Sequence, residues 1–220
     1  MKLADVTLTN VIKTMDNLGY KVFTNDTKNY NLNIVGIRTN DIDIDAFNDI
    51  LCVFWKYRGN WNFHKFMITT NPGSAYTGKK TLNPNGVAVL LPGQHRGLWK
   101  YGTHKGYAAL QQVGKARFIR DNNRNGFLDY TGKEYFDVIA LNCHRAKETG
   151  KTTRVGAWSA ACQVFQDASE FKIFLGFCKA ALTFHENTFS YTLLLEDQMS
   201  KVAAKSVNPF LSKWGLPESF

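Results

Sequence analysis

Between residues 33 and 195 the chain switches repeatedly between short apolar segments and turn residues, a pattern that few folds accommodate. Residues 33–38 and 50–57 are rich in Ile, Val, Phe and Trp, which are enriched in strands. The turn residues Arg58, Gly59 and Asn60 come next, so residues 61–70 are predicted to return as the second strand of a hairpin. This part of the chain is therefore expected to form antiparallel sheet.

The remaining segments predict further strands and a few helices. Apolar runs predict strands over residues 87–91, 116–120, 138–144 and 188–195. Apolar residues at helical spacing predict helices over residues 4–18, 103–112 and 167–183. The fold class is then α+β and β-rich, with a single β-sandwich-like domain. We expect an N-terminal helix and linker (residues 1–32), this main domain (33–195) and a C-terminal tail (196–220).

The bulk composition fits one compact core. The 220 residues are 44% hydrophobic and 14% aromatic, which is enough apolar surface for one sizeable domain. No run of about eighteen apolar residues occurs, so no membrane span is expected. The first residues lack the apolar segment of a secretory signal, so we expect synthesis in the cytoplasm.

The charge balance favours anionic partners without identifying one. The chain has 27 basic and 18 acidic residues, a formal net charge of +9. Such a charge attracts anionic polymers, including those of bacterial surfaces, although an ordinary basic surface explains the same count. The basic residues are scattered rather than gathered in a tract, which makes nucleic-acid binding the weakest interpretation.

One of the four cysteines has the surroundings of a nucleophile. No Cys-x-x-Cys pair occurs, so free thiols are expected. His144 ends an apolar segment ahead of Cys162, and an imidazole within reach activates a thiol. The small residues Ser159, Ala160 and Ala161 permit a tight turn whose amides would face a developing oxyanion. We predict Cys162 as nucleophile, His144 as its base and Ser159 as a support of the turn. The alternative is a buried, inert cysteine.

The same segment resembles the L,D-transpeptidases of the YkuD type. That family has a histidine, then about fourteen to seventeen residues, then Ser or Thr, His, Gly and Cys. Here fourteen residues separate His144 from Ser159, and Cys162 lies three positions later. The hairpin and the turns ahead of His144 follow the family's order, so the resemblance covers roughly residues 48–195. It implies a catalytic domain that acts on the stem peptides of bacterial peptidoglycan and requires no cofactor.

Two departures from the family's motif bear on this implied activity. Ala160 and Ala161 stand where the family has His-Gly, and alanine restricts the backbone torsions that glycine allows. Val164 stands where the family has an arginine that can grip a substrate carboxylate. Either the substrate differs, or a once catalytic scaffold has lost activity.

Two functional hypotheses follow. The resemblance implies a cysteine-dependent peptidoglycan enzyme, hydrolytic rather than cross-linking, acting at the cell wall as a phage lytic or virion-associated protein. His104, Ala161 and Trp158 are expected to contact the substrate. The competing hypothesis is a non-catalytic virion or cell-wall-binding protein on the same fold. Its apolar C-terminal tail, with Phe210 and Trp214, would dock on phage structural proteins.

A separate segment has the opening of a calcium loop. Asp121, Asn123, Asn125 and Asp129 place oxygen ligands at alternating positions, with a glycine sixth in the series. EF-hand calcium loops begin in this way, but a glycine stands at the twelfth position where a glutamate would close the site. The pattern predicts a weak calcium site at most, and an ordinary Asn-rich turn explains the same residues.

Overall fold

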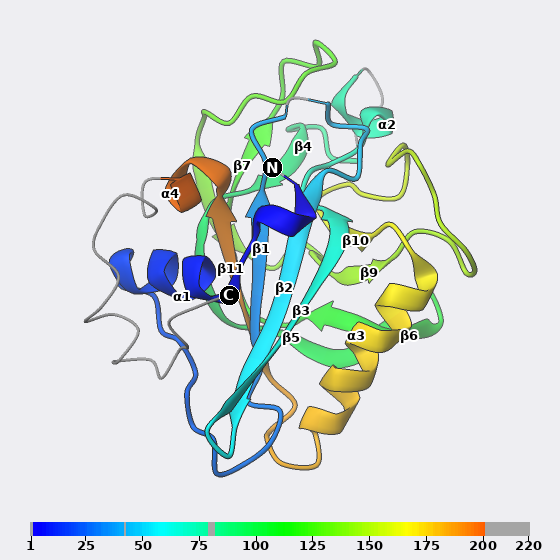
Figure 1. Ribbon diagram of the computed structural model, residues 1–220. Helices are drawn as coiled ribbons and strands as arrows, with labels where there is room; N and C mark the ends of the chain where they lie inside the picture. Colours follow the sequence, from blue (N-terminus) through cyan, green and yellow to red (C-terminus); the bar gives the residue numbers. More distant parts are fainter. Residues whose placement is uncertain (1, 42, 79–81, 201–220) are drawn as a thin grey trace.

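The fold is seen in a computed structural model that describes residues 2–41, 43–78 and 82–200 (Figure 1). The strands of this part are β1 (Asn33–Arg38), β2 (Asp49–Tyr57), β3 (Asn60–Thr69), β4 (Val87–Leu90), β5 (Gly93–His104), β6 (Tyr107–Gln112), β7 (Ala116–Asp121), β8 (Glu134–Asp137), β9 (Cys143–Arg145), β10 (Gln163–Phe165) and β11 (Phe189–Leu195). The larger sheet closes into a barrel in the order β1-β11-β5-β6-β9-β10-β3-β2. A second, three-stranded sheet has the order β4-β7-β8.

Helices cover the barrel rather than forming a layer of their own. They are η1 (Leu3–Asp5), α1 (Leu8–Asn17), α2 (Ser74–Thr77), α3 (Ala168–Ala181) and α4 (Glu196–Ser200). In Figure 1, α1 and α3 lie on opposite sides of the long β2–β3 hairpin. The β-rich α+β class with two sheets and a short N-terminal helix is confirmed. None of the helices in the described ranges is long and apolar enough to cross a membrane.

Helix α1 forms where the sequence predicts it and seals the outer face of the barrel. The hydroxyl of Thr7 accepts a hydrogen bond from the Asn10 amide, which caps the helix at its start. The buried side of α1, with Val11, Ile12 and Met15, packs on outward residues of β1, β2 and β11. Every residue of β1 is therefore buried, although strand residues alternate between two faces.

The interior of the barrel forms the main core. Inward residues of β2, such as Leu51 and Val53, meet Leu98 and Trp99 of β5 in one buried cluster. Helix α3 contributes Phe174 to the same cluster. The three-stranded sheet contributes apolar side chains from β4 and β7, so both sheets share a single core.

The helix predicted over residues 103–112 is wrong, because this segment is the hairpin of β5 and β6. Lys105 and Gly106 form its two-residue turn with φ values of 47° and 86°. Two successive positive φ angles match the twist of a tight hairpin. The run of Ala, Leu and Gln after the turn favours a helix by propensity, but pairing inside a closed barrel outweighs that weak preference.

The strand predicted over residues 138–144 is mostly wrong. Only its end belongs to β9, while a short strand before it, β8, pairs with β7 in the smaller sheet. The chain must therefore cross from one sheet to the other between Val138 and Asn142. The side chain of Gln112 holds this crossing by accepting hydrogen bonds from the amides of Ile139 and Leu141 at 2.9 and 2.6 Å. Apolar composition alone did not distinguish a buried crossing from a strand.

Candidate functional site

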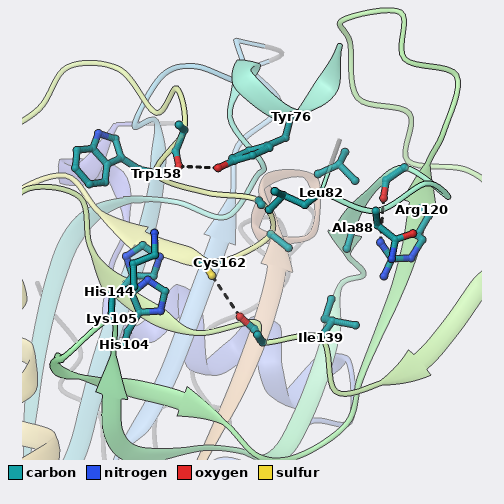
Figure 2. Close-up of a pocket in the computed structure, with 17 residues that line it drawn as sticks. Tyr76, Leu82, Ala88, His104, Lys105, Arg120, Ile139, His144, Trp158 and Cys162 are labelled. Carbon is teal, nitrogen blue, oxygen red and sulfur yellow. Dashed lines mark hydrogen bonds between the residues drawn. The ribbon is translucent and has the colours of Figure 1, made fainter. Parts of the chain in front are cut away.

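A pocket of about 340 Å³ brings together most of the residues predicted for the site. Cys162, His144, His104, Ala161 and Trp158 all line it, although they come from the ends of three strands and one long loop (Figure 2). Cys162 immediately precedes β10, and β10 pairs in parallel with β9, which carries His144. Because β9 and β10 are neighbouring parallel strands, the thiol of Cys162 and the imidazole of His144 line the same pocket.

The turn before Cys162 is closed by Ser159. The Ser159 hydroxyl donates to the carbonyl oxygen of Cys162 at 2.8 Å, and the Ala161 amide lies 3.4 Å from the same hydroxyl. The side chain of Ser159 is fully buried below the pocket rather than facing it. Ser159 thus occupies the supporting position that the sequence predicts, and its part in any reaction stays a prediction.

Ala161 adopts a backbone conformation that favours glycine. Its φ is 137°, in the region that side chains of L-residues rarely enter. A residue held there costs about 1–3 kcal/mol and persists only where its surroundings enforce the geometry. Glycine is the residue that the resembled family has at this position. The turn therefore has a glycine-like backbone at a position that holds alanine.

Buried side chains behind the pocket hold this strained turn. Gln163 donates from Nε2 to the Ala161 carbonyl at 3.3 Å, and Tyr191 donates its hydroxyl hydrogen to Oε1 of Gln163 at 2.6 Å. Tyr191 and Gln163 are both fully buried. The Tyr191 hydroxyl fits only because Gly36 lacks a side chain, since a Cβ there would lie 1.8 Å from it. The core therefore fixes the position of Ala161 through two side chains.

Asp45 connects two segments beside the pocket by hydrogen bonds. Its Oδ1 accepts hydrogen bonds from the Gly156 amide at 2.6 Å and from the Ser74 hydroxyl at 2.8 Å, and its Oδ2 accepts one from Arg154. Burial by itself would raise the pKa of Asp45, but these donors lower that pKa below its ordinary value. The carboxylate thus ties α2 to the loop that carries Trp158.

His144 is oriented by the backbone of the next residue. Its Nδ1 lies 2.8 Å from the carbonyl oxygen of Arg145, which can only accept, so Nδ1 carries the hydrogen. This assignment leaves Nε2 as the unprotonated, basic nitrogen. The hydroxyl of Tyr107 lies 3.3 Å from both atoms and reinforces the orientation. The ring of His144 is buried at 3% exposure on a strand that permits little movement.

His104 stacks on His144 with ring centroids 4.2 Å apart and an interplanar angle of 7°. The amide nitrogen of Asn142 donates to Nδ1 of His104 at 3.0 Å, so His104 carries its hydrogen on Nε2. Desolvation lowers the pKa of His104, and the neighbouring Lys105 lowers it further. Two neutral, stacked imidazoles therefore form one wall of the pocket.

The thiol of Cys162 sits in a less polar environment than an activated cysteine needs. Its sulfur donates to the carbonyl oxygen of Ala140 at 3.5 Å (Figure 2). Burial raises the pKa of Cys162 to about 11, although the Asn142 backbone amide and the charge of Lys105 act in the opposite direction. Burial lowers the pKa of His144 to about 4. At neutral pH the resting pair is thus a neutral thiol and a neutral imidazole, not an ion pair.

Sequence reasoning missed two positive side chains at this pocket. Lys105, in the β5–β6 turn, and Arg120, in β7, both line it, and none of the described residues that line it is a carboxylate. The Arg120 guanidinium donates to the Gly86 carbonyl at 2.9 Å, which orients it at the rim. Because residues 103–112 are predicted as a helix, the sequence does not place Lys105 at the site. A correct hairpin would have placed that lysine at the tip beside His104.

The remaining predicted residues lie elsewhere. Asp121, Asn123 and Asp129 line a second hollow of about 340 Å³, while Asn125 sits in the same loop. Within the described ranges, no group of three or more His, Cys, Asp or Glu side chains is arranged to hold a metal. Cys143 is fully buried on the opposite strand face from His144, as predicted. Phe210, Leu211 and Trp214 of the predicted docking tail lie outside the described residues.

Comparison with protein-family models, with curated proteins and with solved structures finds no match.

Proposed function

We propose that this protein is a cysteine-dependent, L,D-transpeptidase-like peptidase that acts on stem peptides of the bacterial cell wall. The observation that carries the proposal is the convergence of Cys162 and His144 on one pocket from two paired strands. The hydrogen on Nδ1 of His144 leaves Nε2 free to accept a proton, which is the tautomer that a base requires. The strained turn at Ala161 adds the kind of backbone outlier that clusters at active sites.

The chemistry is acyl transfer through a thioester. As the sulfur of Cys162 attacks a peptide carbonyl carbon, Nε2 of His144 takes the thiol proton and a C–S bond forms. The C–N bond of the peptide then breaks, and the leaving amine receives that proton. A water molecule attacks the thioester, releases a carboxylic acid and returns the hydrogen to sulfur. Backbone amides near Ala161 and Cys162 stabilise the oxyanion in both tetrahedral intermediates.

The pKa values of Cys162 and His144 determine whether the thiol loses its proton before the attack or during it. With a thiol pKa of about 11, roughly one sulfur in 10⁴ is a thiolate at pH 7. A preformed thiolate–imidazolium pair is therefore not the resting state, and proton removal accompanies attack. The ammonium of Lys105 stabilises the negative charge as it develops, because it lowers the pKa of Cys162.

The charge of the pocket points to a substrate group with negative charge. Lys105 and Arg120 supply two cations, and within the described part of the chain no acid that lines the pocket opposes them. Val164, which replaces the arginine of the resembled family, is fully buried in a separate apolar cluster with Phe47. It cannot meet a substrate. We assign the recognition of a stem-peptide carboxylate to Lys105 and Arg120 instead, because a guanidinium binds carboxylates well.

The test is digestion of purified peptidoglycan sacculi followed by chromatography of the released muropeptides. We expect new peptide products with the wild type and none with Cys162→Ala or His144→Ala. Cys52→Ala is the matched control, because Cys52 faces the outer cluster packed against α1, away from the pocket. Identical profiles from the wild type and Cys162→Ala, with both proteins folded, would reject the enzymatic proposal.

A non-catalytic wall-binding protein on the same fold is the second candidate. The raised thiol pKa and the bond from sulfur to the Ala140 carbonyl favour it. Mass spectrometry after incubation with muropeptides separates the two. An acyl adduct on Cys162 supports the enzyme. Muropeptide binding of equal affinity by the wild type and Cys162→Ala, without an adduct, supports the binding protein.

A further inference from the structure

The loop between β7 and β8, residues 122–133, leaves a buried carboxylate oxygen without a partner. Asp121 ends β7 and is only 4% exposed. Its Oδ2 accepts a hydrogen bond from the Asp129 amide at 3.3 Å. Its Oδ1 is buried and, within the described ranges, is the one buried side-chain nitrogen or oxygen with no hydrogen-bond partner. A buried oxygen without a partner destabilises the fold unless something outside the protein satisfies it.

The surroundings of Asp121 supply oxygen ligands. Asp121 and Asp129 carry two negative charges into a hollow of about 340 Å³, whose lining includes the amide of Asn123 and the hydroxyl residue Thr131. Nδ2 of Asn123 donates to Oδ2 of Asp129, and the Asp129 backbone amide donates to Oδ2 of Asp121, so the three residues lie together at the hollow. Carboxylate, amide and hydroxyl oxygens without nitrogen or sulfur ligands are the set that hard divalent cations prefer.

Two cationic side chains, Arg120 and Lys133, also line this hollow. The guanidinium of Arg120 donates to the Gly86 carbonyl and lies 5.2 Å from the centre of the Phe118 ring. The ammonium of Lys133 lies 5.5 Å from the centre of the Tyr135 ring. Neither residue has a hydrogen bond or ion pair to Oδ1 of Asp121 in the described structure. Among the described residues, Oδ1 of Asp121 therefore has no partner within the protein.

We propose that the hollow is a Ca²⁺ site in which Oδ1 of Asp121 and the carboxylate of Asp129 are the charged ligands. Flexible oxygen ligands favour Ca²⁺ over Mg²⁺, which demands a near-ideal octahedron. With two carboxylates and no closing glutamate, the dissociation constant is on the order of 10⁻³ M, the range of weak extracellular modules. Bound Ca²⁺ would order the return from β7 to β8 beside the rim residue Arg120. This inference does not depend on the proposed peptidase function.

Calcium titration of the full chain, first freed of metals, tests the site by calorimetry and by the melting temperature. We expect heat on Ca²⁺ addition and a rise in melting temperature up to about 10 mM Ca²⁺, with a much smaller response to Mg²⁺. Asp121→Asn should weaken Ca²⁺ binding at least tenfold. Asp137→Asn is the matched control, because Asp137 is exposed at the end of β8 outside the hollow, and its response should equal that of the wild type.

Two results would overturn the site. The first is the absence of any Ca²⁺ response in the folded wild type. The second is an equal response in the wild type and Asp121→Asn, which would mean binding to the general surface. If Asp121→Asn does not fold, Asp129→Asn takes its place, since Asp129 is less buried and should also lose at least tenfold in affinity. Sacculus digestion is not a readout in this experiment, so its failure would leave the calcium result unchanged.

Discussion

The Cys162 turn and the Asp121 loop are both irregular segments beside a hollow, but they are held in different ways. The turn is anchored by residues far away in the sequence, among them Asp45 and Tyr191. The Asp121 loop is held partly by its own side chains, with Asn123 and Asn125 each accepting the amide two residues ahead. It is also held by hydrogen bonds to residues of other loops and of α2, namely Asn71, Thr77 and Pro84. Its apolar residue Phe127 is 68% exposed, so this side chain is not part of the core.

This difference indicates how each segment meets a ligand. A turn fixed by the core has its geometry before anything binds, which is what a catalytic group requires. The Asp121 loop has an unpaired carboxylate oxygen, so the proposed Ca²⁺ would add contacts to it on binding. We therefore expect core substitutions to damage the Cys162 turn while leaving the calcium response unchanged.

The largest effect is expected from Asp45→Asn. The substitution removes the charge that accepts hydrogen bonds from Gly156, Ser74 and Arg154, and the new amide hydrogens would face those donors. Hydrogen bonds to a buried charged group contribute about 1.5–3 kcal/mol each, so we expect a loss of about 3 kcal/mol in the free energy of unfolding. Sacculus digestion should fall as the Trp158 loop loosens. Glu148→Gln, at an exposed site in the loop after β9, is the control and should change neither quantity.

The same carboxylate predicts a pH dependence. Because the folded state lowers the pKa of Asp45 below its ordinary value of 3.8, its stabilisation is present above that value and is lost as pH falls through the lower, folded pKa. Urea unfolding at a series of pH values should show the gap between the wild type and Asp45→Asn closing in acid. A gap that stays constant down to the lowest pH at which the protein folds would contradict this role.

A smaller loss is expected from Tyr191→Phe. It removes the hydroxyl that donates to Gln163 and leaves a buried amide oxygen unsatisfied, at a cost of about 1–3 kcal/mol. Because Gln163 in turn holds the Ala161 carbonyl, activity should decline although Tyr191 does not line the pocket. Tyr101→Phe, a half-buried tyrosine in β5, is the control. Equal stability and activity in the two variants would mean that the core does not position the turn.

The contrast between the two segments also explains what the sequence could predict. Asn123, Asn125 and Asp129 form a local pattern in which Asn123 bonds to both Asn125 and Asp129, so a short window of sequence is enough to single it out, and its calcium binding stays a prediction. The turn residues Ser159, Ala161 and Cys162 were recognised from their spacing to His144. Their anchors were not, because Asp45 and Gly36 lie more than a hundred residues away and have no motif of their own.

The strand predictions also depend on how local the determining contacts are. The β2–β3 hairpin was predicted well because apolar alternation and a turn signal agree over a long segment. The β5–β6 hairpin was mistaken for a helix because its pairing partners, β11 and β9, come much later in the chain. Closure of the barrel is a property of all eight strands, and no single window of sequence carries it.

The smallest effect, and the only gain, is expected from Ala161→Gly. At a φ of 137° glycine relieves about 1–3 kcal/mol of strain, while its greater freedom in the unfolded chain costs about 0.5–1 kcal/mol, so unfolding should become harder by about 1 kcal/mol. Ala160→Gly is the control; Ala160 has no positive φ, so it should lose about 0.5–1 kcal/mol. Urea denaturation measures both. If the two variants lose stability equally, the core does not impose the glycine-like shape on this turn, and the anchoring by Gln163 and Tyr191 would not be what holds Cys162 in the pocket.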